Sequence, residues 1–138
     1  MKNKIYLFIV FVIMASCSAS DGHIYLIDSS NASYPKFCIS KHSKCKGGAV
    51  TAAFGYQFSE ITSEGEFIKD VWVIFNNTNS NIKIFEYGKV PNGWSETMKA
   101  QPLEVNKYYR IGGSFVYTCD INSKCKTINL IDVYNNKH

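Results

Sequence analysis

The sequence predicts an all-β protein that folds as a single β-sandwich, immunoglobulin-like, with about seven strands and two disulfides. Apolar side chains recur at alternate positions in short runs, and Gly, Asn, Ser and Pro separate these runs. The mature part of the chain shows no helical run. A length of 138 residues with 46% hydrophobic and 14% aromatic residues supports one core and excludes a multidomain enzyme.

The N-terminus reads as a secretion signal. Lys2 and Lys4 precede an uninterrupted apolar run, Ile5 to Met14. Ten residues are too few for a stable membrane span, which takes about 20. We therefore predict a signal peptide over residues 1–16, a tether over 17–22 and the β-sandwich domain over 23–138.

The segment Met14-Ala15-Ser16-Cys17 resembles a bacterial lipobox, in which the cysteine thiol is acylated and becomes the first residue of the mature chain. Cys17 is thus the predicted lipidation site, and two or three acyl chains anchor a protein stably. Ser18 follows it, where Asp would resemble an inner-membrane retention signal, so attachment to the outer membrane, facing the periplasm, is favoured. An ordinary signal peptide cut near Ala19 is the alternative.

Removing Lys2 and Lys4 lowers the formal charge from +4 to +2. Arg110 is the only arginine, so the bidentate donors used for phosphate and base recognition are almost absent. A nucleic-acid partner is disfavoured.

The predicted strands follow the alternating runs and the turn residues between them. Phe67–Phe75 turns apolar on both faces and should be central, and it should form a hairpin with the strand that follows Asn76–Asn81. A second hairpin should join the last two strands, and one helical turn is expected near Ser95–Lys99. The strands are His23–Asp28, Phe37–Ser40, Ala49–Ser59, Phe67–Phe75, Ile82–Tyr87, Tyr108–Thr118 and Lys126–Tyr134.

Four cysteines remain after Cys17, an even number that suits an oxidising compartment. The local pairings Cys38 with Cys45 and Cys119 with Cys125 are favoured, and the two long-range pairings stay open. Cys38, His42 and Cys45 could also be metal ligands, but the spacing does not match the usual zinc signature. We expect disulfides, no metal and no cofactor.

No catalytic set is convincing. The histidines His23, His42 and His138 lie in no recognisable nucleophile motif. Glu60, Glu64 and Glu66 could act as paired carboxylates of a glycosidase. They flank a Gly in a predicted loop, however, so we interpret them as a solvated acidic turn. A non-enzymatic binding module is the expected class, with a small hydrolase as the least favoured alternative.

One segment goes beyond generic β sequence: Phe85-Glu86-Tyr87-Gly88-Lys89-Val90-Pro91-Asn92-Gly93-Trp94, followed by Ala100–Leu103 and Tyr108–Ile111. Together with Phe37–Ser40 and the lipobox, it resembles a family of small bacterial lipoproteins regarded as type VI secretion immunity proteins. The match in order runs from Phe37 to Ile111. The resemblance implies a periplasmic, non-enzymatic inhibitor of a secreted antibacterial toxin, for which a lipase fits a membrane tether best.

The expected toxin contacts lie in three loops, Glu60–Glu66, Asn76–Asn81 and Lys89–Trp94. For Trp94, capping of the core beside a turn at Val90–Gly93 is favoured, and direct contact with the partner is the alternative. The alternative function is a structural or assembly lipoprotein of the envelope that works through strand-edge pairing. The expected contact residues are Glu60, Glu64, Glu66, Asn77, Asn79, Lys89, Asn92 and Trp94.

Overall fold

The computed structural model describes residues 23–40, 45, 50–51, 55–78 and 81–136. The predicted signal peptide, the tether with Cys17, and Asn79, His42 and His138 lie outside these residues.

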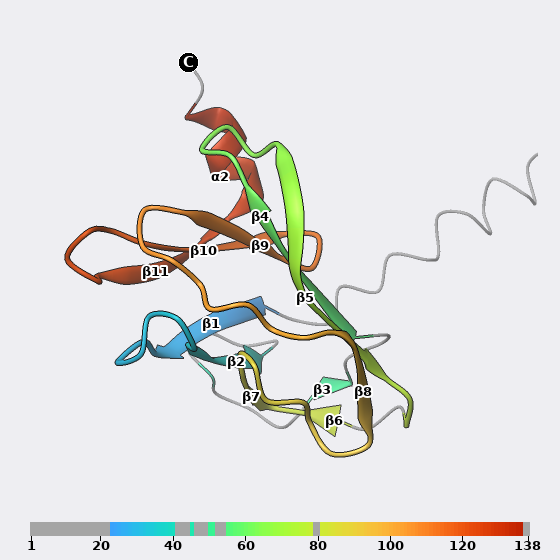
Figure 1. Ribbon diagram of the computed structural model, residues 1–138. Helices are drawn as coiled ribbons and strands as arrows, with labels where there is room; N and C mark the ends of the chain where they lie inside the picture. Colours follow the sequence, from blue (N-terminus) through green and yellow to red (C-terminus); the bar gives the residue numbers. More distant parts are fainter. Residues whose placement is uncertain (1–22, 41–44, 46–49, 52–54, 79–80, 137–138) are drawn as a thin grey trace, which may run out of the picture.

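The described residues form eleven strands and one short helix (Figure 1). Every strand pairing is antiparallel. The elements are β1 (His23–Asp28), β2 (Lys36–Ser40), β3 (Val50–Thr51), β4 (Gly55–Ile61), β5 (Phe67–Asn76), β6 (Asn81–Ile82), β7 (Ile84–Glu86), β8 (Trp94–Met98), β9 (Tyr108–Ile111), β10 (Phe115–Cys119), β11 (Cys125–Asn129) and α2 (Leu130–Asn135).

The strands form a sandwich. A six-stranded sheet has the order β11-β10-β9-β4-β5-β8, and a three-stranded sheet has the order β1-β2-β7. A small β3-β6 pair lies beside them. The main core is made by residues of both larger sheets, with Phe37 and Phe85 on one side and Phe58 and Trp72 on the other. The predicted all-β sandwich with two disulfides is confirmed.

Both local disulfides are present. Cys38 pairs with Cys45, with their Cα atoms 5.7 Å apart. Cys119 pairs with Cys125 at the ends of β10 and β11, with Cα atoms 4.0 Å apart. The long-range pairings are excluded, and the four sulfur atoms are used in bonds to each other.

The predicted hairpin of Phe67–Phe75 with Ile82–Tyr87 is wrong. β5 pairs with β4 and β8, whereas β6 pairs with β3 and β7 pairs with β2. The chain leaves the six-stranded sheet after Asn76 because Phe85 belongs between the sheets, where its ring stacks on Phe37 at 5.4 Å. Alternation predicts a strand but not its partner.

Two predicted strands are shorter than expected. Tyr108–Thr118 is itself a hairpin, β9–β10, that turns at Gly112, whose φ is +60°. Ala49–Ser59 becomes β3 and β4, and Gly55 begins β4 with a φ of +133°. A Cβ atom at Gly55 would collide with the backbone carbonyl oxygen of Ile74. Both glycines therefore mark interruptions within apolar runs.

Two further segments have a secondary structure that differs from the predicted one. The segment expected to form a helical turn is strand β8, which pairs with the last part of β5. The segment Lys126–Tyr134 is a strand only to Asn129, and α2 follows it. Leu130 and Val133, three positions apart on one helix face, pack with Ile61 and Val116 in a second, smaller core. Tertiary packing, not local alternation, decides both segments.

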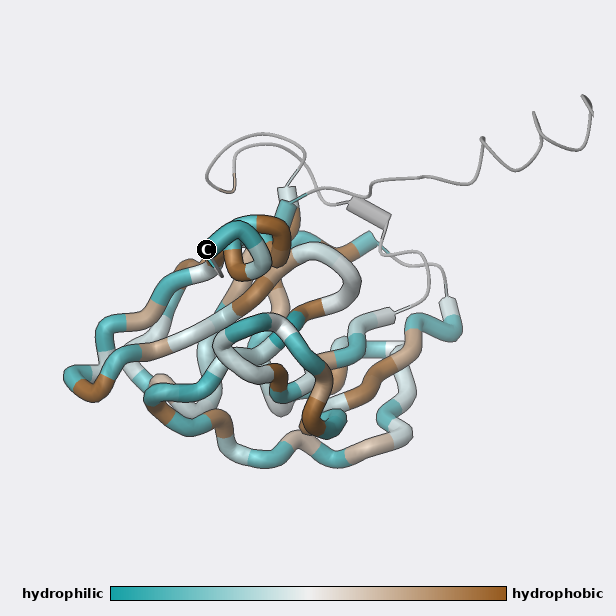
Figure 2. Tube along the Cα trace, turned by 90° about the horizontal axis from the view of Figure 1, so that it is seen from above, coloured by the Kyte–Doolittle hydropathy of each residue, from teal (hydrophilic) through white to brown (hydrophobic). Residues whose placement is uncertain are grey.

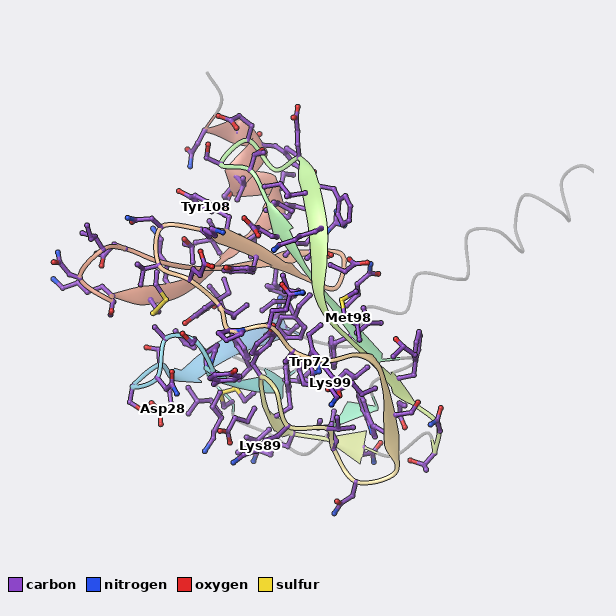
Figure 3. All side chains as sticks on the ribbon, viewed as in Figure 1. Asp28, Trp72, Lys89, Met98, Lys99 and Tyr108 are labelled. Atoms are coloured by element: carbon purple, nitrogen blue, oxygen red, sulfur yellow. A yellow bond between two sulfur atoms is a disulfide. The ribbon has the colours of Figure 1, made fainter. Side chains whose placement is uncertain are left out.

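Trp72 lies at the centre of the main core and is fully buried (Figure 3). Its ring contacts those of Phe58 at 5.4 Å and Tyr87 at 5.0 Å. Its indole Nε1 donates a 2.7 Å hydrogen bond to Glu96 of β8. Burial is thus achieved without leaving the indole N–H unpaired, as buried tryptophans require.

We predict that Trp72→Ala lowers the free energy of unfolding by about 3–5 kcal/mol, because it opens a cavity at the centre of the core. Urea unfolding followed by circular dichroism measures the change. Phe75→Ala is the control, since Phe75 lies in the same strand with its side chain exposed. Equal losses in both variants would contradict this assignment of the core.

Candidate functional site

Among the described residues, the expected contact residues in turns lie at two opposite ends of the molecule. Glu64 and Glu66 lie in the turn before β5, and Asn77 follows its last residue. A strand of ten residues is roughly 33 Å long, so the two groups cannot form one compact site. Figure 1 shows the β4–β5 turn beside α2 at one end and the turns around β6, β7 and β8 at the other.

The turns that follow β5 and β7 meet at the second end. Asn76 pairs with Trp94 in the sheet, and a Cβ atom at Gly93 would lie 2.9 Å from Thr78. Asn77 and Asn92 are exposed there. The structure thus brings two of the predicted asparagines to the same end.

Lys89 is also exposed near this end (Figure 3). Its Nζ lies 2.9 Å from the carboxylate of Glu86, three positions earlier in the sequence. The positive charge of Lys89 is therefore paired with a carboxylate of the same chain.

The position of Trp94 is set by its packing in the main core. It is buried, and its ring stacks on Tyr56 with centroids 6.1 Å apart. A turn precedes it, in which its N–H donates to the carbonyl oxygen of Pro91 at 3.0 Å and Gly93 has a φ of +79°. The burial supports the core-capping interpretation and argues against Trp94 as a contact residue, because a partner could not reach the ring.

Glu60 does not lie in a solvated turn either. It belongs to β4 and is buried, and its carboxylate oxygens lie 3.2 Å from Lys107 Nζ and 3.8 Å from Lys69 Nζ. Two lysines therefore balance its charge inside the sheet. The burial argues for a structural role, which sequence spacing alone could not separate from that of Glu64 and Glu66.

The network continues through Lys107, whose Nζ also lies 2.9 Å from Glu104. Hydrogen bonds to Glu104 and Glu60 raise the pKa of the Lys107 ammonium. The hydrogen bond and the charge of Lys107 lower the pKa of the Glu104 carboxyl. Both groups are therefore held in their charged forms around neutral pH.

Glu64 and Glu66 are exposed in the β4–β5 turn, whose backbone is fixed. The N–H of Gly65 donates to the carbonyl oxygen of Thr62 at 2.9 Å, and the N–H of Thr62 donates to that of Glu66 at 2.8 Å. Gly65 has a φ of +91°, and a Cβ atom there would lie 2.6 Å from the ring of Tyr134. The turn thus packs closely against α2, from a segment about 70 residues later in the sequence.

Large apolar side chains are exposed beside these carboxylates. Phe67 is 56% exposed and Ile131 is 65% exposed, and Ile68 and Tyr134 are also exposed. Phe67 pairs with Ile61, so its side chain lies on the face of the sheet that α2 covers. Ile131 and Tyr134 are three positions apart on α2. We call Glu64, Glu66, Phe67, Ile68, Ile131, Asp132 and Tyr134 the acidic end.

A cavity of about 400 Å³ opens at the acidic end. Its lining includes Ile131 and Tyr134 together with Leu130, Asn129, Gly113 and Ser114. The sequence did not indicate the apolar part of this surface, because exposed and buried apolar residues follow the same pattern in a strand or helix. The available signal was the run Leu130–Tyr134, in which Asp132 is the only charged residue.

The described residues contain no group of three or more His, Cys, Asp or Glu side chains that could hold a metal ion. His23 packs edge-on against the ring of Phe115 at 5.7 Å. Across the same part of the chain, no helix has the length and apolar character needed to cross a membrane.

The comparisons with known proteins give no relative: no family model matches the chain, and neither the curated proteins nor the solved structures contain a match.

We predict that Gly65→Ala loosens α2 from the sheet, because an alanine is strained at this φ and its Cβ would displace Tyr134. The cost should be about 1–3 kcal/mol. Faster amide exchange in residues 130–135 would show it. Gly113→Ala is the matched control, since nothing lies within 4 Å of a Cβ there. Unchanged exchange in Gly65→Ala would refute the contact.

Acid stability should depend on Glu104. The pKa of its carboxyl is lowered in the folded state, so its contribution is present above the unfolded value of 4.5 and is lost as pH falls through the folded value. Glu104→Gln should therefore lose less stability than the wild type between pH 5 and pH 3. Thermal unfolding across this range measures the difference, and parallel curves for the two proteins would contradict the ion pair.

Proposed function

We propose that the chain is a membrane-anchored periplasmic immunity lipoprotein that binds and neutralises a cognate antibacterial toxin delivered by type VI secretion. The proposal is supported mainly by the composition of the acidic end. Exposed aromatic and aliphatic side chains lie there within a rim of carboxylates, on a turn and a helix that hold each other in place.

This surface has the composition of a protein-binding site. A few aromatic or aliphatic anchors dominate the free energy of most protein interfaces, and Phe67 and Tyr134 have the required size and exposure. The carboxylates of Glu64, Glu66 and Asp132 would speed association with a basic partner and reject an acidic one. The toxin is therefore expected to present a basic rim around an apolar patch.

The proposed location rests on two features. Two disulfides in a small domain are typical of proteins that fold in an oxidising compartment. The lipobox-like segment ending in Cys17 would tether the mature chain to a membrane, with outer-membrane attachment favoured. A lipase is the favoured toxin class, because the tether keeps the inhibitor at the surface where the lipase finds its substrate.

A second candidate is an assembly lipoprotein of the envelope that works through strand-edge pairing. One observation favours it: β8 pairs with β5 only along Val73–Asn76. Within the described residues, the outer edge of Phe67–Asp70 therefore has no neighbouring strand, and a strand of another protein could extend the sheet there.

Toxin binding is tested with the product of the adjacent gene. Cells lacking the present gene should stop growing when that product is directed to their periplasm, and the wild-type protein should restore growth. The double variant Glu64→Lys with Glu66→Lys should bind the toxin about 100-fold more weakly, because two charges are reversed in the rim. Calorimetry with the purified proteins measures the affinity.

The control is Asn77→Ala with Asn92→Ala, which changes two exposed residues at the opposite end. It should keep both protection and affinity. Survival of the deletion strain with the toxin in its periplasm would count against immunity. Loss of affinity only in the asparagine variant would place the toxin contact at the end of Asn77 and Asn92 and would contradict the assignment to the acidic end.

A further inference from the structure

The loop that joins β10 to β11 is a rigid projection. The Cys119–Cys125 disulfide closes its base. The carboxylate of Asp120 accepts hydrogen bonds from the N–H groups of Asn122 and Lys124, at 2.8 and 2.9 Å. Two backbone hydrogen bonds between Asp120 and residues 123 and 124 complete the turn. The loop is therefore held in one conformation before anything binds it.

This loop presents one large apolar side chain to solvent. Ile121 is 73% exposed, more than any other large hydrophobic residue of the described chain. In Figure 2 the hairpin extends to the left of the molecule, and a short hydrophobic segment lies among hydrophilic ones at its tip. A rigid loop loses little conformational entropy on binding, so an exposed isoleucine on it is suited to insert into an apolar cavity.

The base of the loop is basic. A cavity of about 370 Å³ lies there, and its lining includes Lys124 and Lys126 with Asn106 and Tyr108. Asp120 also lines it, and its carboxylate accepts hydrogen bonds from the loop backbone. Two lysines against one aspartate leave the lining with a net positive charge. We call Ile121, Lys124, Lys126 and this cavity the basic tip.

The basic tip and the acidic end are opposite in charge, and both have an exposed apolar part. One has a projecting isoleucine beside two lysines, and the other has an apolar cavity beside Glu64 and Glu66. Tyr134 links the two parts of the acidic end, since it lines the cavity and contacts Gly65 between the two glutamates. Arg110 on the neighbouring strand β9 is half-buried, whereas Glu64, Glu66 and Asp132 are exposed.

We propose that the partner of the basic tip is the acidic end of a second copy of this chain. Ile121 of one copy enters the cavity lined by Ile131 and Tyr134 of the next, and Lys124 and Lys126 pair with Glu64 and Glu66. The two surfaces differ, so the contact is head-to-tail and each copy can bind one neighbour at either end.

The proposed contact consists of one apolar side chain and two charge pairs, so we expect association to be weak and reversible in solution. Anchoring both copies to one membrane would raise their effective concentration and favour the contact. The self-association does not depend on the proposed toxin binding. It uses the same acidic end, however, so a bound toxin and a bound neighbour exclude each other.

Photo-crosslinking in living cells tests the contact on the full chain. A copy with one affinity tag carries a photo-crosslinking amino acid in place of Ile121, and a second copy carries a different tag. Illumination should give a crosslinked pair of the two tagged copies. Mass spectrometry should map the crosslink to residues 113–114 or 130–134 of the second copy.

The second copy then carries Glu64→Lys with Glu66→Lys. The yield of crosslinked pairs should fall about tenfold, because two attractive contacts become repulsive. The control is Asn77→Lys with Asn92→Lys, which adds two positive charges at exposed positions of the opposite end. It should leave the yield unchanged, and secretion at wild-type levels confirms that both variants fold.

Three outcomes would overturn the proposal. The first is no crosslink from position 121. The second is a crosslink only to a lipid or to a different protein, which would make the basic tip a docking site of another kind. The third is a crosslink to a second copy at a place other than the acidic end, or one whose yield both double variants leave unchanged.

Discussion

The packing of aromatic rings between the two larger sheets is the constraint on which the rest of the structure depends. Phe37 and Phe85 from one sheet meet Phe58 from the other, and Trp72 and Tyr87 complete the cluster. Their polar atoms are satisfied across chain segments: the Tyr87 hydroxyl donates to the carbonyl oxygen of Gln101 at 2.7 Å. Among the described residues, no buried side-chain nitrogen or oxygen lacks a partner. The core therefore fixes the long connections as well as the strands.

Two buried tyrosines, Tyr87 and Tyr117, illustrate how the core fixes these connections. Burial raises the pKa of Tyr87, and it raises that of Tyr117 to about 12. Both hydroxyls therefore stay protonated and remain hydrogen-bond donors at any physiological pH. The Tyr117 hydroxyl donates to the carbonyl oxygen of Ala32 at 2.9 Å and so ties the β1–β2 connection to β10. With the core rigid, the β4–β5 turn, α2 and the β10–β11 loop are held at fixed positions on its surface.

The two proposed binding surfaces, the acidic end and the basic tip, are formed by these elements. Apolar residues are exposed beside the carboxylates of the acidic end and beside the lysines of the basic tip, and in each case nearby backbone geometry is fixed by a glycine turn or a disulfide. Fixed geometry reduces the entropy lost on binding, which matters most for small contacts. A protein that keeps such residues exposed on rigid elements is suited to bind other proteins through them.

The sequence by itself determined the fold class and the approximate positions of most strands, and it favoured the local disulfides, because alternation and cysteine spacing are local properties of the chain. The structure decided the pairing of the cysteines. The sequence also marked Glu64 and Glu66 as exposed. Only the tertiary structure decided which strands pair, that Glu60 and Trp94 are buried, and that α2 follows β11. It alone brought Tyr134 against Gly65, since contacts between segments 69 residues apart depend on how all the intervening strands pack.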